Sequence, residues 1–286
     1  MDGIINVYKE AGFTSHDVVA KMRGILRQKK IGHTGTLDPD ATGVLPVCLG
    51  SATKLCDMLT DRDKEYEAVM QLGISTDTQD LSGEVLEERP VTVTEEEVRN
   101  AIRSFIGDYD QIPPMYSALK VNGKKLYEYA RKGEEVEIKP RSVNISDLKI
   151  LNYDQENRIL ELYIKCSKGT YIRSIAHDLG KNLRCFGHLI KLVRVKAGDF
   201  EVKNSVKLED LTNTEEVKKH LIYPLKKLDY QTYELNTKEL ELVSHGMQIF
   251  ARTSLQNGIV ILTNNNKLIA IAEMLNDKIK CSKVFI

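Results

Sequence analysis

The sequence has no long apolar segment and no export signal. Among its 286 residues, no run approaches the roughly 20 consecutive apolar residues that cross a bilayer. The N-terminal stretch MDGIINVYKEAGF lacks the charged region and following apolar region of a secretory signal. We therefore expect a cytoplasmic protein without a membrane partner.

Cysteine and histidine are few and scattered. The five cysteines form no CxxC pair, and the six histidines show no spacing typical of metal ligands. This pattern argues against a disulfide framework and against a zinc site. Residues 32–54 contain several glycines, but no GK[ST] follows them, so the loop of nucleotide-dependent enzymes is missing. We expect an activity that uses no metal and no cofactor.

A net charge is also lacking, since 41 basic residues balance 41 acidic ones. The charges are nevertheless segregated along the chain. Residues 77–97 contain eight acids and one arginine, whereas residues 21–30 contain five basic residues and no acid. Basic residues outnumber acids by eight to three in 160–200 and by seven to four in 111–141. Such segments can build a groove that follows phosphates, although solvated helix faces would explain them equally well.

Hydrophobic periodicity predicts a mixture of strands and helices. The predicted strands are 3–9, 64–72, 143–150, 159–166, 258–263 and 267–274. The predicted helices are 15–26, 51–61, 94–106, 126–131 and 170–183, with Ser15 and Ser51 capping the first two and a Thr94–Glu97 capping box opening the third. Residues 28–43 are predicted to form a loop. Because strands and helices do not alternate strictly, we expect an α+β fold with a mixed, mostly antiparallel sheet flanked by helices.

One segment stands out chemically, GHTGTLDPDATGVLPVCLGSATK at residues 32–54. Asp38 precedes Pro39, which restricts the backbone of Asp38 to extended conformations. A carboxylate fixed on a rigid turn suits acid–base or covalent work at a sugar carbon. Asp38 and Asp40 could equally well cap turns, which is the more common role of such residues. The residues alone leave both interpretations open.

Four blocks resemble, in the same order, those of the TruB family of tRNA pseudouridine synthases. The first is the 32–54 segment. The others are KEYEAVMQLGISTDTQDLSG at 64–83, QIPPMYSALKVNGKKLYEYARKG at 111–133 and CSKGTYIRSIAHDLG at 166–180. The resemblance covers about residues 1–200, and the chain beyond about residue 230 resembles the small β-rich, PUA-like domain of bacterial members.

The resemblance implies an architecture and a reaction. It implies a catalytic domain at 1–228, a thumb-like insertion at about 111–141 and a PUA-like RNA-binding domain at 229–286. The family isomerises uridine 55 in the T-arm of tRNA to pseudouridine: the N1–C1′ bond breaks, the uracil turns, and C5 bonds to C1′. The target base must first be flipped out of its loop.

Three residues are expected to carry the chemistry. Asp38 matches the catalytic aspartate of the family and would attack C1′ or stabilise a cationic centre there while a glycal forms. Tyr66 matches the active-site tyrosine, which is expected under the flipped base, although core packing is its ordinary interpretation on a strand face with Ala68 and Met70. Arg173 matches an arginine that is expected to pair with Asp38, keep it ionised and aim it.

Further residues are expected to contact the substrate. His33 is expected to hold the extruded loop, and Leu192 to pack on the target base. The remaining candidates on the matched blocks are Lys64, Asp80, Lys120, Lys124 and Tyr171. One position departs from the family, which often has Leu-Arg-Arg where this chain reads Leu192-Val193-Arg194, so one backbone or phosphate contact is in doubt.

Two other interpretations use the same scaffold. One is a tRNA-folding chaperone role, either without catalysis or beside it. The other is the guide-RNA-dependent branch of the family, which lacks the thumb in this form and adds partner-binding extensions. The insertion at 111–141 and the presence of Asp38, Tyr66 and Arg173 favour a stand-alone, monomeric enzyme whose partner is tRNA, with no obligatory guide RNA or protein.

Overall fold

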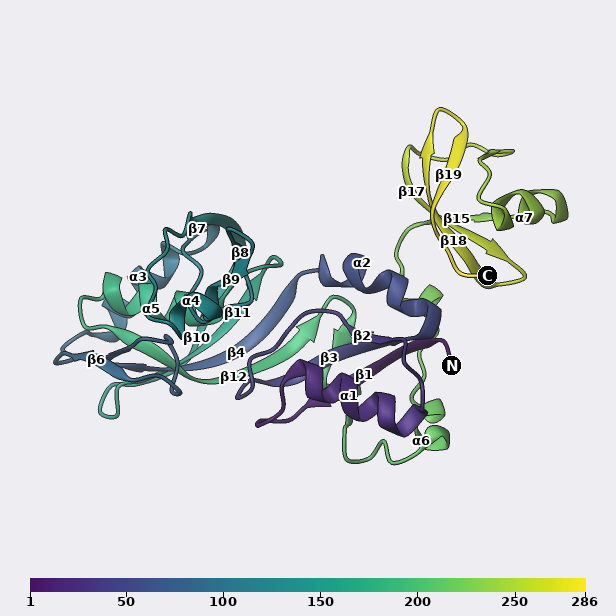
Figure 1. Ribbon diagram of the computed structural model, residues 1–286. Coiled ribbons are helices and arrows are strands. Elements are labelled where there is room, and N and C mark those ends of the chain that lie inside the picture. Colours follow the sequence, from purple (N-terminus) through teal and green to yellow (C-terminus); the bar gives the residue numbers. More distant parts are fainter.

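The computed structural model describes residues 1–286 as an elongated larger part with a smaller unit above one end (Figure 1). The larger part is built on a ten-stranded sheet. Its strand order is β14 (Val206–Lys207), β1 (Gly3–Lys9), β3 (Thr42–Leu49), β12 (Gly187–Ala197), β4 (Lys64–Leu72), β11 (Ile159–Cys166), β10 (Arg141–Asp154) and β7 (Gly107–Gln111), with β2 (Ile31–His33) beside β3 and β13 (Phe200–Glu201) beside β12.

The strand pairing of this sheet is mixed and mostly antiparallel. Only β1 with β14 and β3 with β12 are parallel, and the other neighbours are antiparallel. The predicted strand 64–72 is confirmed as β4, in which every second residue from Lys64 to Leu72 is buried. Its neighbour β12 was not predicted, yet it joins the β1–β3 half of the sheet to the β4–β11 half.

Helices cover both faces of the sheet, which confirms the predicted α+β class. Alternate residues of β1 face opposite ways: Ile5 packs with Val18 of α1, whereas Ile4 packs with Leu55 and Leu59 on the other side. Besides α4 (Leu126–Ala130) in the insertion described below, the helices of the larger part are α1 (Ser15–Leu26), α2 (Cys56–Thr60), α3 (Glu95–Arg103), α5 (Ile172–Asn182) and α6 (Thr214–Lys219), with 3-10 turns η1 (Gly50–Leu55), η2 (Val202–Asn204) and η3 (Pro224–Lys227).

Two predicted helix starts were wrong in detail. The cap of α1 is Thr14, which forms a capping box with Asp17, and Ser15 is the first helical residue. The segment predicted as one helix at 51–61 is η1 followed by α2, and Ser51 caps neither. The capping box of Thr94 and Glu97 is confirmed at the start of α3.

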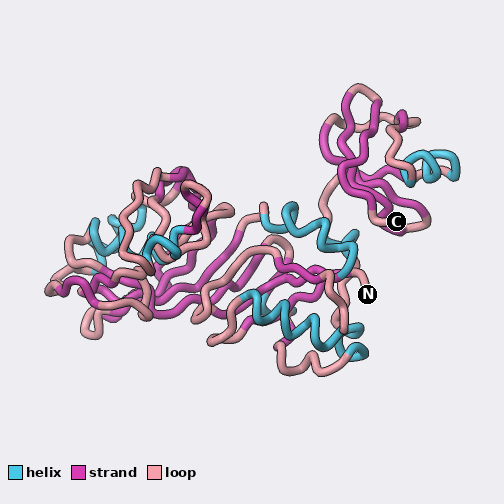
Figure 2. The backbone as a smooth tube through the Cα atoms, in the orientation of Figure 1, coloured by secondary structure: helices cyan, strands magenta, loops and turns pink.

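The two irregular segments contain short elements. The loop predicted at 28–43 includes β2, because residues 31–33 pair with residues 47–49 of β3. Residues 111–141, called the insertion below, are mostly loop, as Figure 2 shows. The insertion contains β8 (Lys120–Val121), β9 (Lys124–Lys125) and α4 (Leu126–Ala130), and a separate hairpin is formed by β5 (Ile74–Thr76) and β6 (Val85–Glu88).

The smaller unit is a five-stranded sheet with one helix. Its order is β15 (Gln231–Glu234), β17 (Gly258–Asn264), β18 (Lys267–Leu275), β19 (Lys278–Val284) and β16 (Ile249–Phe250), and its helix is α7 (Thr237–Ser244). Ile261 and Ile271 share a hydrophobic cluster with Leu55 and Leu59, so this sheet packs on η1 and α2. No helix of the protein is both long and apolar enough to cross a membrane.

Candidate active site

The loop that carries Asp38 lies beside the middle of the large sheet and is held by hydrogen bonds along its length. Ser15 Oγ accepts from Leu37 N at 2.8 Å and contacts Leu37 O at 3.2 Å. Lys9 is fully buried, and its Nζ donates to Pro39 O at 2.8 Å. Because backbone groups on both sides of Asp38 are bonded, its position is fixed before any substrate arrives.

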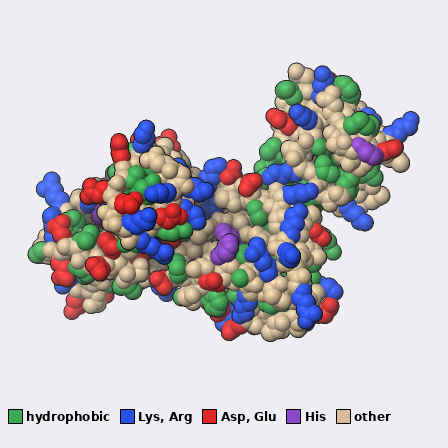
Figure 3. Space-filling view, in the orientation of Figure 1, with side chains coloured by type: hydrophobic (Ala, Val, Ile, Leu, Met, Phe, Trp, Pro, Cys, Tyr) green, Lys and Arg blue, Asp and Glu red, His purple; other side chains and the backbone are tan.

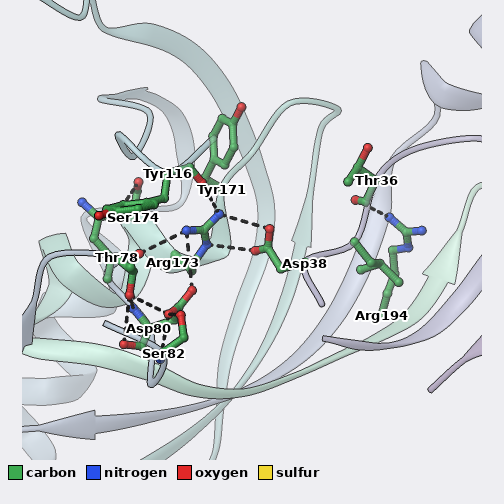
Figure 4. Close-up of polar contacts among 12 residues, drawn as sticks. Thr36, Asp38, Thr78, Asp80, Ser82, Tyr116, Tyr171, Arg173, Ser174 and Arg194 are labelled. Atoms are coloured by element: carbon green, nitrogen blue, oxygen red, sulfur yellow. Dashed lines mark hydrogen bonds and ion pairs between the residues drawn. The ribbon is translucent and has the colours of Figure 1, made fainter. Parts of the chain in front are cut away.

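Asp38 faces Arg173, which lies in the first turn of α5. Arg173 Nε is 2.9 Å from Asp38 Oδ2, and Nη2 is 3.1 Å from Oδ1, so the pair is bidentate (Figure 4). The Arg173 side chain is only 6% exposed, whereas the Asp38 side chain is 42% exposed. The carboxylate is therefore held from behind while part of it stays accessible.

Arg173 also fixes the surrounding segments. Its Nη1 donates to Thr78 O at 3.1 Å, and its Nη2 donates to Tyr116 O at 3.0 Å in the insertion. Asp80 Oδ2 lies 3.5 Å from Nη1, while Asp80 Oδ1 accepts from the hydroxyls of Thr78 and Ser82 (Figure 4). One guanidinium thus links the Asp38 loop, the 78–82 turn and the insertion.

Opposing effects set the pKa of Asp38. Burial raises the pKa of Asp38, Arg173 lowers it, and the nearby Asp80 carboxylate raises it again, so the net direction is upward. Pairing with Arg173 therefore favours the ionised form, as expected, but burial and the like charge outweigh it. The carboxylate is poised closer to protonation than an exposed aspartate.

Tyr66 lies on β4 at the wall of a cavity of about 440 Å³, called the inner cavity below, which Asp38, Arg173 and Leu192 also line. Tyr66 is 7% exposed and belongs to the same core cluster as Ala68 and Met70, so core packing is one role of this residue. Burial raises the pKa of Tyr66 to about 12. Its hydroxyl is therefore protonated at neutral pH.

Lys64 and Tyr171 line the same cavity. Lys64 is 6% exposed, its Nζ donates to Arg62 O at 2.6 Å and to Thr60 O, and burial lowers its pKa to about 8. The Lys64 ammonium is thus already bonded to protein carbonyls.

Gln111 holds the backbone of Tyr171 by two hydrogen bonds. Its Nε2 donates to Tyr171 O at 2.9 Å, and its Oε1 accepts from Tyr171 N at 2.7 Å.

A second cavity of about 650 Å³, called the outer cavity below, lies on the other side of Asp38. Asp80 lines only this cavity, whereas Asp38, Arg173 and Leu192 line both. Tyr116 and Tyr127 of the insertion also line both. The insertion therefore reaches over Asp38 at the point where the two cavities meet.

Three predicted substrate-binding residues lie outside both cavities. His33 ends β2, its Nδ1 is buried without a hydrogen-bond partner, and burial together with Arg194 lowers its pKa. Lys120 and Lys124 are exposed on the small hairpin of the insertion. The structure therefore groups Asp38, Tyr66, Arg173, Leu192, Lys64, Tyr171 and Asp80, and leaves His33, Lys120 and Lys124 apart from them.

Some positioning residues were not found from the sequence. Lys9, Arg194 and Gln111 are buried polar side chains bonded to the backbone around the cavities. A lysine or arginine is usually assigned to the surface. Only Gln111 lies in a matched block, so the residue types gave no signal for Lys9 or Arg194. No group of three or more His, Cys, Asp or Glu side chains is arranged to hold a metal ion.

Charged side chains are unevenly distributed over the surface. On the face shown in Figure 3, Lys and Arg side chains lie on both sides of the hollow in the middle of the elongated part, over the insertion and over α1 and α2. Asp and Glu side chains are most numerous on the lobe that carries β6, α3 and the insertion, where they lie among Lys and Arg side chains. Strand β6 of the acidic segment lies away from the hollow, at one end of the elongated part (Figure 1).

Two family models match the chain. Residues 23–172 match the model described as TruB family pseudouridylate synthase (N terminal domain). Residues 173–228 match the model described as tRNA pseudouridylate synthase B C-terminal domain.

Similar proteins and structures agree with these matches. A protein of Caldanaerobacter subterraneus subsp. tengcongensis named tRNA pseudouridine synthase B is 43% identical over 290 residues, which is 100% of this chain and 99% of that protein. One of the same name from Lachnoclostridium phytofermentans is 54% identical over 217 residues, covering 74% and 71%. A chain in a crystal structure of a Cbf5-Nop10-Gar1 complex has a TM-score of 0.76 and 26% identity, with 99% of this chain and 85% of that chain covered.

Proposed function

Because the chain belongs to the TruB family of pseudouridylate synthases, we propose that it isomerises uridine 55 in the T-arm of tRNA to pseudouridine. The observation that carries this proposal is the bidentate pair of Asp38 and Arg173 at the junction of two cavities, one of them walled by Tyr66. A fixed, partly exposed carboxylate is what a reaction at the electrophilic C1′ of a nucleotide requires.

Each group has a role in the proposed reaction. Asp38 acts at C1′ when the N1–C1′ bond breaks, either as a nucleophile or as the negative charge beside a glycal-forming centre. The freed uracil turns, C5 bonds to C1′, the proton on C5 is lost and N1 takes up a proton, so atoms balance and the reaction is an isomerisation without a cofactor. Arg173 aims Asp38, the ring of Tyr66 lies under the uracil, and Leu192 packs on it.

Binding of the RNA is assigned to the surroundings of these cavities. The flipped base enters beside Tyr171 and Lys64, while His33, the Asp80 turn and the basic residues Lys120 and Lys124 contact the folded T-loop and its phosphates. The insertion acts as a thumb over the nucleotide. Residues 229–286 form a PUA-like RNA-binding domain beside the catalytic domain at 1–228, and the protein acts in the cytoplasm as a monomer without guide RNA or an obligatory protein partner.

The experiment is an assay on a T-arm stem-loop. The protein is incubated with the hairpin without added nucleotide or metal, and pseudouridine is located by nucleoside analysis and sequence mapping. We expect one pseudouridine at the position of uridine 55, and none in a hairpin with cytidine there. A lack of product with a folded protein and a bound hairpin would contradict the proposal, as would a requirement for added metal or nucleotide.

A further inference from the structure

Arg194 is a buried cation beside the active site that the proposed reaction does not use. It lies on β12, two residues after Leu192, and is 1% exposed. No carboxylate lies within salt-bridge distance of its guanidinium. Burying a charge without a counterion is unfavourable unless hydrogen bonds compensate for the lost water. The bonds that compensate indicate what the residue does.

Three hydrogen bonds of the Arg194 guanidinium go to backbone carbonyls on the two sides of the Asp38 loop. Nη2 donates to Gly35 O at 3.1 Å. Nη1 donates to Thr36 O at 3.4 Å, just before Asp38 (Figure 4). Nε donates to Val44 O at 2.7 Å, after the loop has returned to the sheet as β3. One rigid group therefore holds both ends of a ten-residue segment.

The backbone of Arg194 connects the same loop to Tyr66. Arg194 pairs with Gly43 of β3 on one side and with Tyr66 of β4 on the other. Gly43 has a φ of 105°, and a Cβ there would lie 2.3 Å from Arg194 O, so the end of the loop approaches β12 as closely as glycine allows. A displacement of Arg194 would move the loop relative to Tyr66.

We propose that Arg194 is a positioning residue for Asp38, acting as a clamp whose three donors fix the Gly35, Thr36 and Val44 carbonyls against strand β12. Arginine suits this place because its planar guanidinium carries donors in several fixed directions, whereas a lysine ammonium of the same charge is a single point. Arg194 also lines the inner cavity, but its donors are engaged by the carbonyls of Gly35, Thr36 and Val44. We therefore expect its replacement to lower the rate and to leave RNA affinity unchanged.

The test is Arg194→Lys, with Arg158→Lys as the matched control, since Arg158 is exposed and its side chain makes no hydrogen bond. Single-turnover rates are measured with enzyme in saturating excess over the T-arm hairpin, so that a partly unfolded sample does not lower the rate constant. We expect the rate of Arg194→Lys to fall by about ten- to a hundredfold, the scale of a loss of about 1 Å in alignment. We expect unchanged hairpin affinity and a wild-type rate for the control. If Arg194→Lys does not fold, Arg194→Gln takes its place.

A double mutant separates positioning from general destabilisation. If Arg194 and Arg173 both act through Asp38, the combined Arg194→Lys and Arg173→Lys variant will be less impaired than the product of the two single effects. A wild-type rate for Arg194→Lys, or multiplicative effects, would overturn the inference. Because the inference rests on the proposed role of Asp38, Asp38→Asn is assayed in parallel. An active Asp38→Asn enzyme would instead overturn the proposed function.

Discussion

At the scale of single residues, the site is the Asp38 carboxylate on a loop that buried lysine and arginine side chains hold in place. Lys9 and Arg194 bond carbonyls of the Asp38 loop, and Arg173 bonds the carboxylate itself. Burial lowers the pKa of Lys9 to about 8, while the charges of Asp40 and Asp38 oppose that shift. The Lys9 ammonium also donates to three backbone carbonyls, those of Glu10, Phe13 and Pro39. The protein thus places positive charge around the loop, and Asp38 is the carboxylate that lines both cavities.

The aiming role of Arg173 makes a prediction for Arg173→Lys. Lysine keeps the charge but cannot form the bidentate contact with Asp38 or reach Thr78 O and Tyr116 O at the same time. We expect the single-turnover rate to fall at least tenfold, which corresponds to about 1.4 kcal/mol of barrier, with little change in the dissociation constant. A wild-type rate would show that Arg173 supplies charge alone.

The balance of charges at Asp38 predicts the pH dependence. Since Asp38 must be ionised to act at C1′, the chemical rate should fall as the pH is lowered through its raised pKa. Asp80 is one cause of that raised pKa, so Asp80→Asn should lower the pKa of Asp38 and move the acid limb of the single-turnover profile to lower pH. Asp38→Asn does not serve here, because it removes the titrating group. A shift of the acid limb to higher pH would contradict this account of Asp38.

At the scale of elements, the sequence predicted some parts of the fold and missed others for a physical reason. Strand β4 followed from its alternating pattern, and α3 followed from its capping box. Strand β12 was not predicted because it buries His188 and Arg194, and alternation of apolar and polar residues would assign such polar side chains to the surface. Their burial depends on carbonyl partners contributed by residues far away in the chain.

The candidate site was likewise predicted in part: residues carried over from the family pattern were found, and residues that bond to the backbone were not. Asp38, Tyr66 and Arg173 were expected in one site because they match a family pattern, and in the structure all three line the inner cavity. Lys64 was expected to contact substrate, but its ammonium is bonded to carbonyls of the preceding turn. Bonds to the backbone cannot be inferred from the residue type, which is why Lys9, Arg194 and Gln111 were missed.

The hairpin of the insertion makes a prediction about RNA affinity. Lys124 is exposed, with its Nζ 5.5 Å from the Tyr129 ring centroid, and is free to meet a phosphate. We expect Lys124→Ala to weaken hairpin binding and to make the plot of log affinity against log salt shallower, by about 0.7–0.9 for one lost phosphate contact. Lys149→Ala, an exposed lysine on β10 outside the basic segments, is the control. Equal salt slopes for Lys124→Ala and wild type would remove Lys124 from the interface.

At the scale of the whole molecule, the two sheets are joined by packing rather than by a shared sheet. Ile261 and Ile271 share a hydrophobic cluster with Leu55 and Leu59, and Lys283 lies 3.7 Å from Asp57 across the contact. The smaller sheet is thereby docked on η1 and α2, at the end of the elongated part away from β6 and α3 (Figure 1), and none of residues 229–286 lines either cavity. This arrangement suits a unit that adds RNA contacts without touching the reacting nucleotide.

Removal of residues 229–286 tests whether the smaller unit contributes to RNA binding but not to the reaction. We expect weaker binding of full-length tRNA, measurable turnover of a short T-arm hairpin at high enzyme concentration, and a lower melting temperature, since Leu55 and Leu59 lose apolar neighbours. Circular dichroism and thermal unfolding establish that the truncated protein is folded. Complete loss of hairpin turnover in a folded truncation would show that the boundary or the assigned role is wrong.

The central claim is that Asp38 acts directly at C1′ of the target uridine. Its most direct test is single-turnover pseudouridine formation by Asp38→Asn on the T-arm hairpin, with the dissociation constant measured on the same samples. Asparagine keeps the shape of the side chain and removes the charged oxygen, so we predict essentially unchanged binding and no detectable pseudouridine. Pseudouridine formation by Asp38→Asn at a rate near that of the wild type would contradict the account.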